Sequence, residues 1–199
     1  MHTFLENYRS ELSGLLRSFD LEQVGRFIEI LKQARDEDRQ IFVFGNGGSA
    51  STASHFAVDM VKGASLGCEK RFRMMALTDQ VPTITAYAND IGYQVVFEEP
   101  LRNFARPGDI VLAISASGNS PNVLRAVEYA NSIACVTLGL CGFQGGRLAP
   151  LCHHSLIVHS THIGRIEDLH MLACHLMCYY FMDVEKAASR QTTPSSPAE

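Results

Sequence analysis

The fold is indicated most clearly by the stretch Phe42-Val43-Phe44-Gly45-Asn46-Gly47-Gly48-Ser49-Ala50, in which an apolar strand runs into a glycine turn and then a helix. A helix that begins directly after such a turn has free backbone N–H groups, and these can hold an anion. His55 and Asp59 follow on the same helix, four residues apart and therefore on one face. An anion site beside a histidine and a carboxylate predicts an enzyme that acts on a phosphorylated small molecule.

The composition is that of a globular protein. The chain has 199 residues, of which 46% are hydrophobic and 19% charged, so it can bury a sizeable core. A net charge of -4 provides no polybasic surface, and we expect neither nucleic acid nor membrane as a partner. The six cysteines lack metal-binding spacing and are expected to be buried, reduced thiols. With no signal peptide and no apolar run long enough to span a bilayer, we expect a cytoplasmic protein.

Strands and helices alternate along most of the chain, which is typical of a parallel sheet covered on both faces. Right-handed crossovers then give a doubly wound, three-layer α/β sandwich. Two amphipathic helices precede it, and Asp20 with Gln23 forms a capping box for the second. We expect one domain over residues 1–188 and a mobile, disordered tail over 189–199. The expected strands are Ile41–Phe44, Met74–Leu77, Ile110–Ile114, Cys135–Leu140 and Leu156–Val158, and the expected helices are 3–18, 21–36, 49–63, 81–106 with a break near Gly92, 120–132, 145–152 and 163–187.

A second candidate site is the loop Ser115-Ala116-Ser117-Gly118-Asn119-Ser120-Pro121, which follows an expected strand. Ser120 and Pro121 suit the N-cap and the first position of a helix, so capping alone explains one serine. It does not explain all three. Three hydroxyls with free N–H groups make a good uncharged cradle for phosphate, and ligands of open α/β sheets bind beyond the carboxyl ends of the strands. The loop therefore predicts phosphate binding.

Ordinary structural roles are alternatives for the other candidates. A glycine pair after a strand is often only a tight turn, and this one matches neither a Walker loop nor the dinucleotide fingerprint. Asn89-Asp90 on its own fits a helix end before Gly92. His55 and Asp59 lie on a helix of mostly small or apolar residues, where they form either a satisfied core hydrogen bond or a site.

The motifs taken together resemble those of the phosphoheptose isomerases, a branch of the sugar isomerase (SIS) domain superfamily. The resemblance rests on the glycine turn with His55, on Ala88–Asp90, on Ile114–Val123 and on Arg165–His170, and it spans residues 3–185. It implies a flavodoxin-like αβα sandwich with a five-stranded parallel sheet and an N-terminal helical hairpin. It also implies a homotetramer with active sites at subunit interfaces. The implied reaction converts D-sedoheptulose 7-phosphate to D-glycero-D-manno-heptose 7-phosphate through an enediol, for bacterial cell-surface polysaccharide.

The resemblance further implies roles for individual residues. Asp59 and His175 match the catalytic acid–base pair, and His55, Asp59, Glu167 and His175 match the ligands of a zinc ion. Three positions depart from the family: Asp59 replaces a glutamate, Glu167 a glutamine and Ala116 a threonine. Two imidazoles and two carboxylates still suit zinc. The positions matched to substrate binding are Asn46, Gly47, Gly48, Ser49, Asn89, Asp90, Ser115, Ser117, Ser120 and Glu167.

The spacing of Glu167 and His175 bears on how such a site is built. Eight residues of helix separate them by about 12 Å along the axis, whereas metal–ligand bonds are only about 2 Å long. One helix cannot easily present both side chains to one ion. We therefore expect these two residues to serve different sites or a site shared between subunits, and a monomer to be inactive.

Two other functions fit the same loops. Some SIS relatives keep the phosphosugar pocket but act as non-catalytic, regulatory binding proteins, for example at replication initiation. Another possibility is an isomerase of a different phosphosugar, because the loops specify phosphate better than chain length. The presence of both Asp59 and His175, two titratable groups, favours the enzyme.

Overall fold

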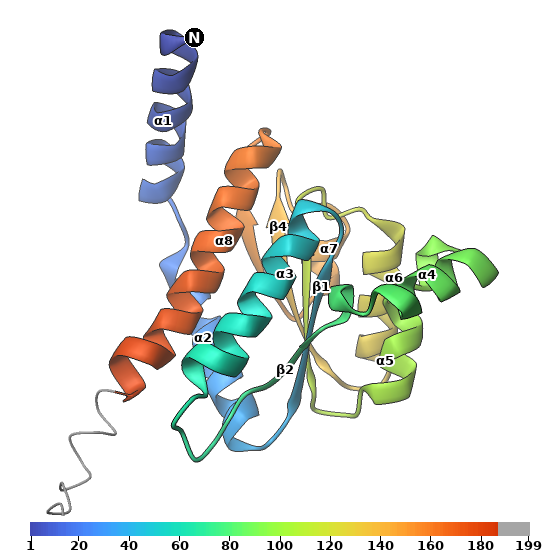
Figure 1. Ribbon diagram of the computed structural model, residues 1–199. Coiled ribbons are helices and arrows are strands. Elements are labelled where there is room, and N and C mark those ends of the chain that lie inside the picture. Colours follow the sequence, from blue (N-terminus) through green and yellow to red (C-terminus); the bar gives the residue numbers. More distant parts are fainter. Residues whose placement is uncertain (187–199) are drawn as a thin grey trace, which may run out of the picture.

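The computed structural model describes residues 1–186, so the predicted tail at 189–199 lies outside the described residues, as does the last residue of the predicted helix 163–187. Five parallel strands form one sheet in the order β2-β1-β3-β4-β5 (Figure 1). This order confirms the flavodoxin-like sandwich. The strands are β1 (Gln40–Gly45), β2 (Arg73–Ala76), β3 (Ile110–Ser115), β4 (Val136–Gly142) and β5 (His154–Val158).

Helices cover both faces of the sheet, as the apolar strands require. In β1, Ile41 and Val43 pack with α2, α3 and α8, whereas Phe42 and Phe44 pack with α5, α6 and α7 on the opposite face. The central strands are therefore buried on both sides. The helices of the first layer are α2 (Leu21–Asp36), α3 (Gly48–Val58) and α8 (Ile163–Tyr179), and those of the second are α4 (Val81–Asp90), α5 (Glu98–Phe104), α6 (Pro121–Ser132) and α7 (Leu148–Leu151).

Two long helices change their winding at or just after residues expected to be functional. The predicted helix 49–63 is α-helical only to Val58 and continues as a π-helix, Asp59–Ala64. The predicted helix 163–187 likewise changes at Tyr180 to a π-helix, Tyr180–Glu185. π-Turns in helices occur frequently at functional sites. The helix predicted over 81–106 is interrupted near Gly92, where a short 3₁₀ turn, Tyr93–Val95, separates α4 from α5.

The N-terminal helix α1 (His2–Arg17) extends away from the sheet (Figure 1). It forms where the sequence predicts it, and Asp20 caps α2 as expected, accepting a bond of 2.9 Å from the Gln23 N–H. However, α1 has no buried residue and does not fold back along α2 as a packed hairpin. It contacts the first turns of α8 instead, where the Tyr8 hydroxyl donates to Asp168 at 2.6 Å and Glu11 pairs with Arg165.

Within the described residues, we find no helix that combines the length and the apolar character needed to cross a bilayer. The six cysteines are all free thiols, and four of them are buried. Burial raises the pKa of Cys141 and of Cys178 to about 12, so these thiols are protonated and unreactive at neutral pH.

Candidate active site

The glycine turn and the serine loop meet at the carboxyl edge of the sheet. β1 and β3 are neighbours, with Gly45 in register with Ile114, so the segments that follow the two strands leave the sheet side by side. The approach is close, because a Cβ on Gly45 would lie 2.7 Å from the Ile114 carbonyl oxygen. Gly47 has a φ of +55°, which glycine adopts without strain, and α3 begins at Gly48. In flavodoxin-like sheets, this β1/β3 position is the usual place for a ligand.

The serine loop is folded around its own hydroxyl groups. The Gly118 N–H donates to Ser115 Oγ at 3.2 Å, and the Asn119 N–H donates to Ser117 Oγ at 3.2 Å. Ser120 Oγ lies 3.5 Å from Ser115 Oγ, so these two hydroxyls face the same space. Ser120 occupies the N-cap of α6, but its side chain makes no capping bond. The predicted N-cap position of Ser120, with Pro121 beginning the helix, is confirmed, but capping does not occupy the Ser120 hydroxyl.

Two side chains without a predicted role, Tyr93 and Asn122, connect the loops. Asn46 Nδ2 donates to Asn122 Oδ1 and Asn122 Nδ2 donates to Asn46 Oδ1, both at 2.9 Å. The Tyr93 hydroxyl donates to Asn46 Oδ1, also at 2.9 Å. Asn122 is only 2% exposed. In the sequence, Asn122 could have been noticed as an amide side chain in the first turn of a helix, directly after Ser120 and Pro121. If such a side chain is buried, its polar atoms need hydrogen-bond partners.

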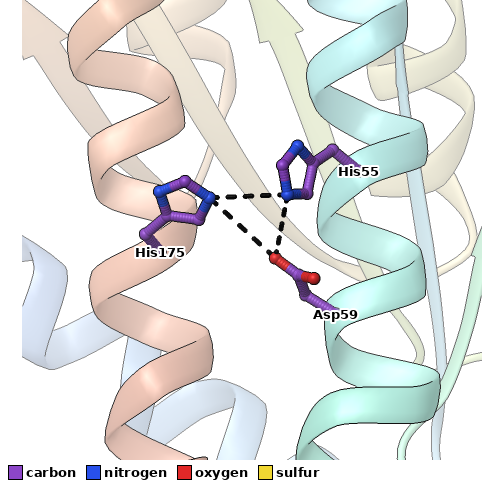
Figure 2. A group of neighbouring side chains, drawn as sticks. All are labelled: His55, Asp59 and His175. Atoms are coloured by element: carbon purple, nitrogen blue, oxygen red, sulfur yellow. Dashed lines mark hydrogen bonds and ion pairs between the residues drawn. The ribbon is translucent and has the colours of Figure 1, made fainter.

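The side chains of His55 on α3, Asp59 at the start of its π-helical continuation, and His175 on α8 converge (Figure 2). His55 Nε2 lies 3.3 Å from Asp59 Oδ2 and 3.5 Å from His175 Nε2, and His175 Nε2 lies 4.0 Å from Asp59 Oδ2. The three side chains are between 27% and 47% exposed. Packing of α3 against α8 thus adds His175 to the pair whose i,i+4 spacing the sequence already placed on one face.

This cluster fits a tetrahedral metal ion. Bonds of about 2.0–2.1 Å from zinc to nitrogen or oxygen place neighbouring ligand atoms about 3.3 Å apart. The observed separations of 3.3, 3.5 and 4.0 Å are close to this value. Two imidazoles and one carboxylate are also ligands that zinc commonly has in catalytic sites, where a fourth position stays open.

Glu167 lies apart from the cluster, near the start of α8. Its carboxylate is against Gly48, so that a Cβ on this glycine would come within 2.8 Å of Glu167 Cδ. Glu167 therefore faces the first turn of α3, where free N–H groups and the helix dipole favour a negative charge. In this chain, Glu167 and His175 do point to different places, as their spacing led us to expect.

The other predicted substrate residues lie around the same edge. Ser49 is 5% exposed and lies in the first turn of α3, where backbone N–H groups have no partner within the helix. Asn89 and Asp90 end α4 on the surface, joined by a bond of 2.8 Å from Asn89 Nδ2 to Asp90 Oδ1. Tyr93 brings the segment that follows them into contact with the glycine turn.

His170 anchors α8 between its two predicted functional residues. Its Nε2 lies 3.0 Å from the carbonyl oxygen of Cys141, to which it donates, and its Nδ1 is buried without a hydrogen-bond partner. Burial lowers the pKa of His170 to about 4, against the smaller, opposite effect of the bond to Cys141. The residue is therefore a neutral, structural histidine at physiological pH.

Comparison with known proteins gives concordant matches. The family model described as the SIS domain matches residues 4–142. The phosphoheptose isomerase of Helicobacter hepaticus is 35% identical over 184 residues, covering 89% of this chain and 91% of the relative. That of Helicobacter pylori strain P12 is 36% identical over 157 residues, covering 79% and 81%. The solved phosphoheptose isomerase from Neisseria gonorrhoeae superposes with a TM-score of 0.84 at 30% identity, covering 92% of this chain and 99% of that one.

Proposed function

Because the chain belongs to the SIS domain family, and within it to the phosphoheptose isomerases, we propose that it isomerises D-sedoheptulose 7-phosphate to D-glycero-D-manno-heptose 7-phosphate. The single observation that carries the proposal is the convergence of His55, Asp59 and His175 from two helices. It supplies titratable groups that a protein which only binds a sugar phosphate does not need. Heptose for bacterial cell-surface polysaccharide is the proposed use of the product.

Phosphate binding is assigned to the serine loop. The hydroxyls of Ser115 and Ser120 face one another, and the N-terminus of α6 adds a dipole that favours an anion. The glycine turn and Asn89-Asp90 are left for the sugar. Binding energy from the phosphate, which does not react, then holds C1 and C2 in place for proton transfer.

The chemistry assigned to the cluster is proton transfer between neighbouring carbons. One of Asp59 and His175 removes a proton from C1 of the ketose, and the C1–C2 enediol forms as the C2 carbonyl oxygen gains a proton. The second group assists that protonation. Delivery of a proton to C2 and loss of the O1 proton then give the aldose. No atom is gained or lost overall.

We propose zinc as the cofactor, held by His55 Nε2, Asp59 Oδ2 and His175 Nε2. The separations of these ligand atoms support this assignment. With the ion bound, the second carboxylate oxygen of Asp59 is the basic atom that stays free to accept the proton from C1. A bound zinc ion would supply positive charge next to the reacting carbons. We assign Glu167 of the same chain to a different part of the site, at the glycine turn, where it would contact substrate or complete a neighbouring subunit's ligand set.

We further propose a homotetramer in which the active sites lie at subunit interfaces. Apolar side chains surround the cluster on the surface: Val58 is 56%, Tyr179 50% and Leu176 36% exposed. Residues of this kind next to a site support its coverage by another subunit. The whole of residues 1–188 is assigned to one SIS domain, and the cytoplasm is the proposed location, where its free thiols would stay reduced.

The test is turnover of D-sedoheptulose 7-phosphate by the full chain, with and without a chelator. We expect the aldose product to form, and activity to fall with chelation and return with zinc. No turnover, combined with thermal stabilisation by the same sugar phosphate, would overturn the proposal in favour of a phosphosugar-binding regulatory protein. If the chain turns over only another phosphosugar, the proposed substrate is wrong and only the proposed reaction, aldose–ketose isomerisation, stands.

A further inference from the structure

The side chains of Asn46 and Asn122 form a closed pair of hydrogen bonds across the candidate site. Each amide donates to the carbonyl oxygen of the other at 2.9 Å, although the residues are 76 positions apart in the chain. Asn46 belongs to the glycine turn after β1. Asn122 is the second residue of α6, immediately after the serine loop.

Burial makes this pair a fixed connection. Asn122 is 2% exposed, and its Oδ1 also accepts a hydrogen bond from the Val123 N–H at 3.0 Å. The side chain of Asn122 thus caps the N-terminus of α6. A buried amide that loses its partner destabilises the protein, because its polar atoms are then left without hydrogen bonds. The two asparagines therefore hold one another in a single arrangement.

The pair leaves little of Asn46 free for substrate. Asn46 Oδ1 accepts from both Asn122 and Tyr93, which uses both of its lone pairs, and one of the two Nδ2 hydrogens is bound to Asn122. Tyr93 lies on the segment that follows Asn89 and Asp90. The network thus joins three of the segments to which substrate contacts are assigned: the glycine turn, the start of α6 beside the serine loop, and the segment after Asn89 and Asp90.

We propose that Asn122 is a positioning residue, which acts through Asn46 to set the distance between the phosphate loop and the glycine turn. This inference rests on the proposed function and deepens it. A sugar phosphate is held by its phosphate at one loop and reacts at its other end, so the distance between the loops selects its chain length. Asn122 is therefore a determinant of the preference for a seven-carbon over a six-carbon ketose phosphate.

The experiment compares kcat/KM for D-sedoheptulose 7-phosphate and D-fructose 6-phosphate in wild type, Asn122→Ala, Asn46→Ala and the double variant. The ratio of the two kcat/KM values does not depend on how much enzyme is folded. We expect Asn122→Ala to lower it about tenfold, less than the roughly 10²-fold that a misplacement of 1 Å can cost. The double variant should fall no further, because Asn122 acts through Asn46. Tyr93→Phe should lower the ratio less.

Asn131→Ala is the matched control. Asn131 lies on the same helix and also bonds through its amide, to the Leu151 carbonyl oxygen at 2.9 Å and to Thr137 at 2.8 Å, but at the opposite end. We expect it to lower stability and leave the ratio unchanged. An unchanged ratio in Asn122→Ala would overturn the inference, as would effects of Asn46→Ala and Asn122→Ala that simply add.

Failure of the proposed function would be seen separately. If wild type turns over neither sugar, the same variants are compared by calorimetric Kd for D-sedoheptulose 7-phosphate and inorganic phosphate. The serine loop's own bonds do not involve Asn122. Weaker sugar phosphate binding with unchanged phosphate binding would then support the positioning role, and equal changes in both would overturn it.

Discussion

The buried histidine on α8 leads to a prediction about acid stability. His170 has a folded-state pKa of about 4, below its ordinary value of 6.5, because burial penalises the imidazolium. Unfolding therefore takes up a proton between pH 6.5 and pH 4, and stability falls as the pH falls through that window. Above pH 6.5, His170 is neutral in both states and adds no pH dependence. The difference in pKa corresponds to about 3 kcal/mol.

The assay is urea unfolding of wild type and His170→Gln at pH 7.5 and pH 4, at one protein concentration. Glutamine can still donate to the Cys141 carbonyl oxygen but does not titrate. We expect wild type to lose about 3 kcal/mol more than the variant between the two pH values. In a chain of this size, that corresponds to roughly 6–12 °C in Tm. Equal losses in the two proteins would refute the account of His170 as a buried, neutral residue.

Three further substitutions test the site. Asp59→Asn should lower kcat about 10²–10⁴-fold with a near-normal calorimetric Kd for D-sedoheptulose 7-phosphate; unchanged turnover would remove Asp59 from the mechanism. His55→Ala should abolish zinc binding in elemental analysis. As a control, replacement of His159, an exposed histidine outside the cluster, by alanine should leave zinc binding intact. Equal zinc contents of the two variants would rule out the cluster as the zinc site. Gly48→Ala should displace the Glu167 carboxylate and lower activity without unfolding the protein. The control Gly25→Ala, whose new methyl group meets open space, should stay fully active. Normal activity of Gly48→Ala would show that activity does not depend on the position of the Glu167 carboxylate.

The fold was largely predictable because its strands are buried on both faces. Continuous apolar runs alternating with helices locate β1–β5 to within two residues and imply a parallel sheet. The π-turns after Val58 and Tyr179 were not predictable, since each π-helix has only 6 residues, too few to show a periodicity of its own in the sequence. The course of α1 was also not predictable, because amphipathicity shows that a helix has an apolar face but not what covers it.

The candidate site was predictable where it depends on local spacing. The i,i+4 relation placed His55 and Asp59 on one face, and the eight-residue interval indicated that Glu167 and His175 do not meet. The addition of His175 to that pair depends on the packing of α3 against α8, which no local pattern contains. The same holds for Asn122, whose partner is 76 residues away.

The most direct test of the central claim is isomerisation of D-sedoheptulose 7-phosphate in D₂O, followed by NMR. A proton that Asp59 or His175 removes is held on a side-chain oxygen or nitrogen, from which it should exchange with solvent deuterium before it returns. The account predicts deuterium at C2 of the aldose in wild type, with both product formation and exchange slowed about 10²–10⁴-fold in Asp59→Asn. Product formed without any deuterium in product or recovered substrate would contradict an enediol route through these residues.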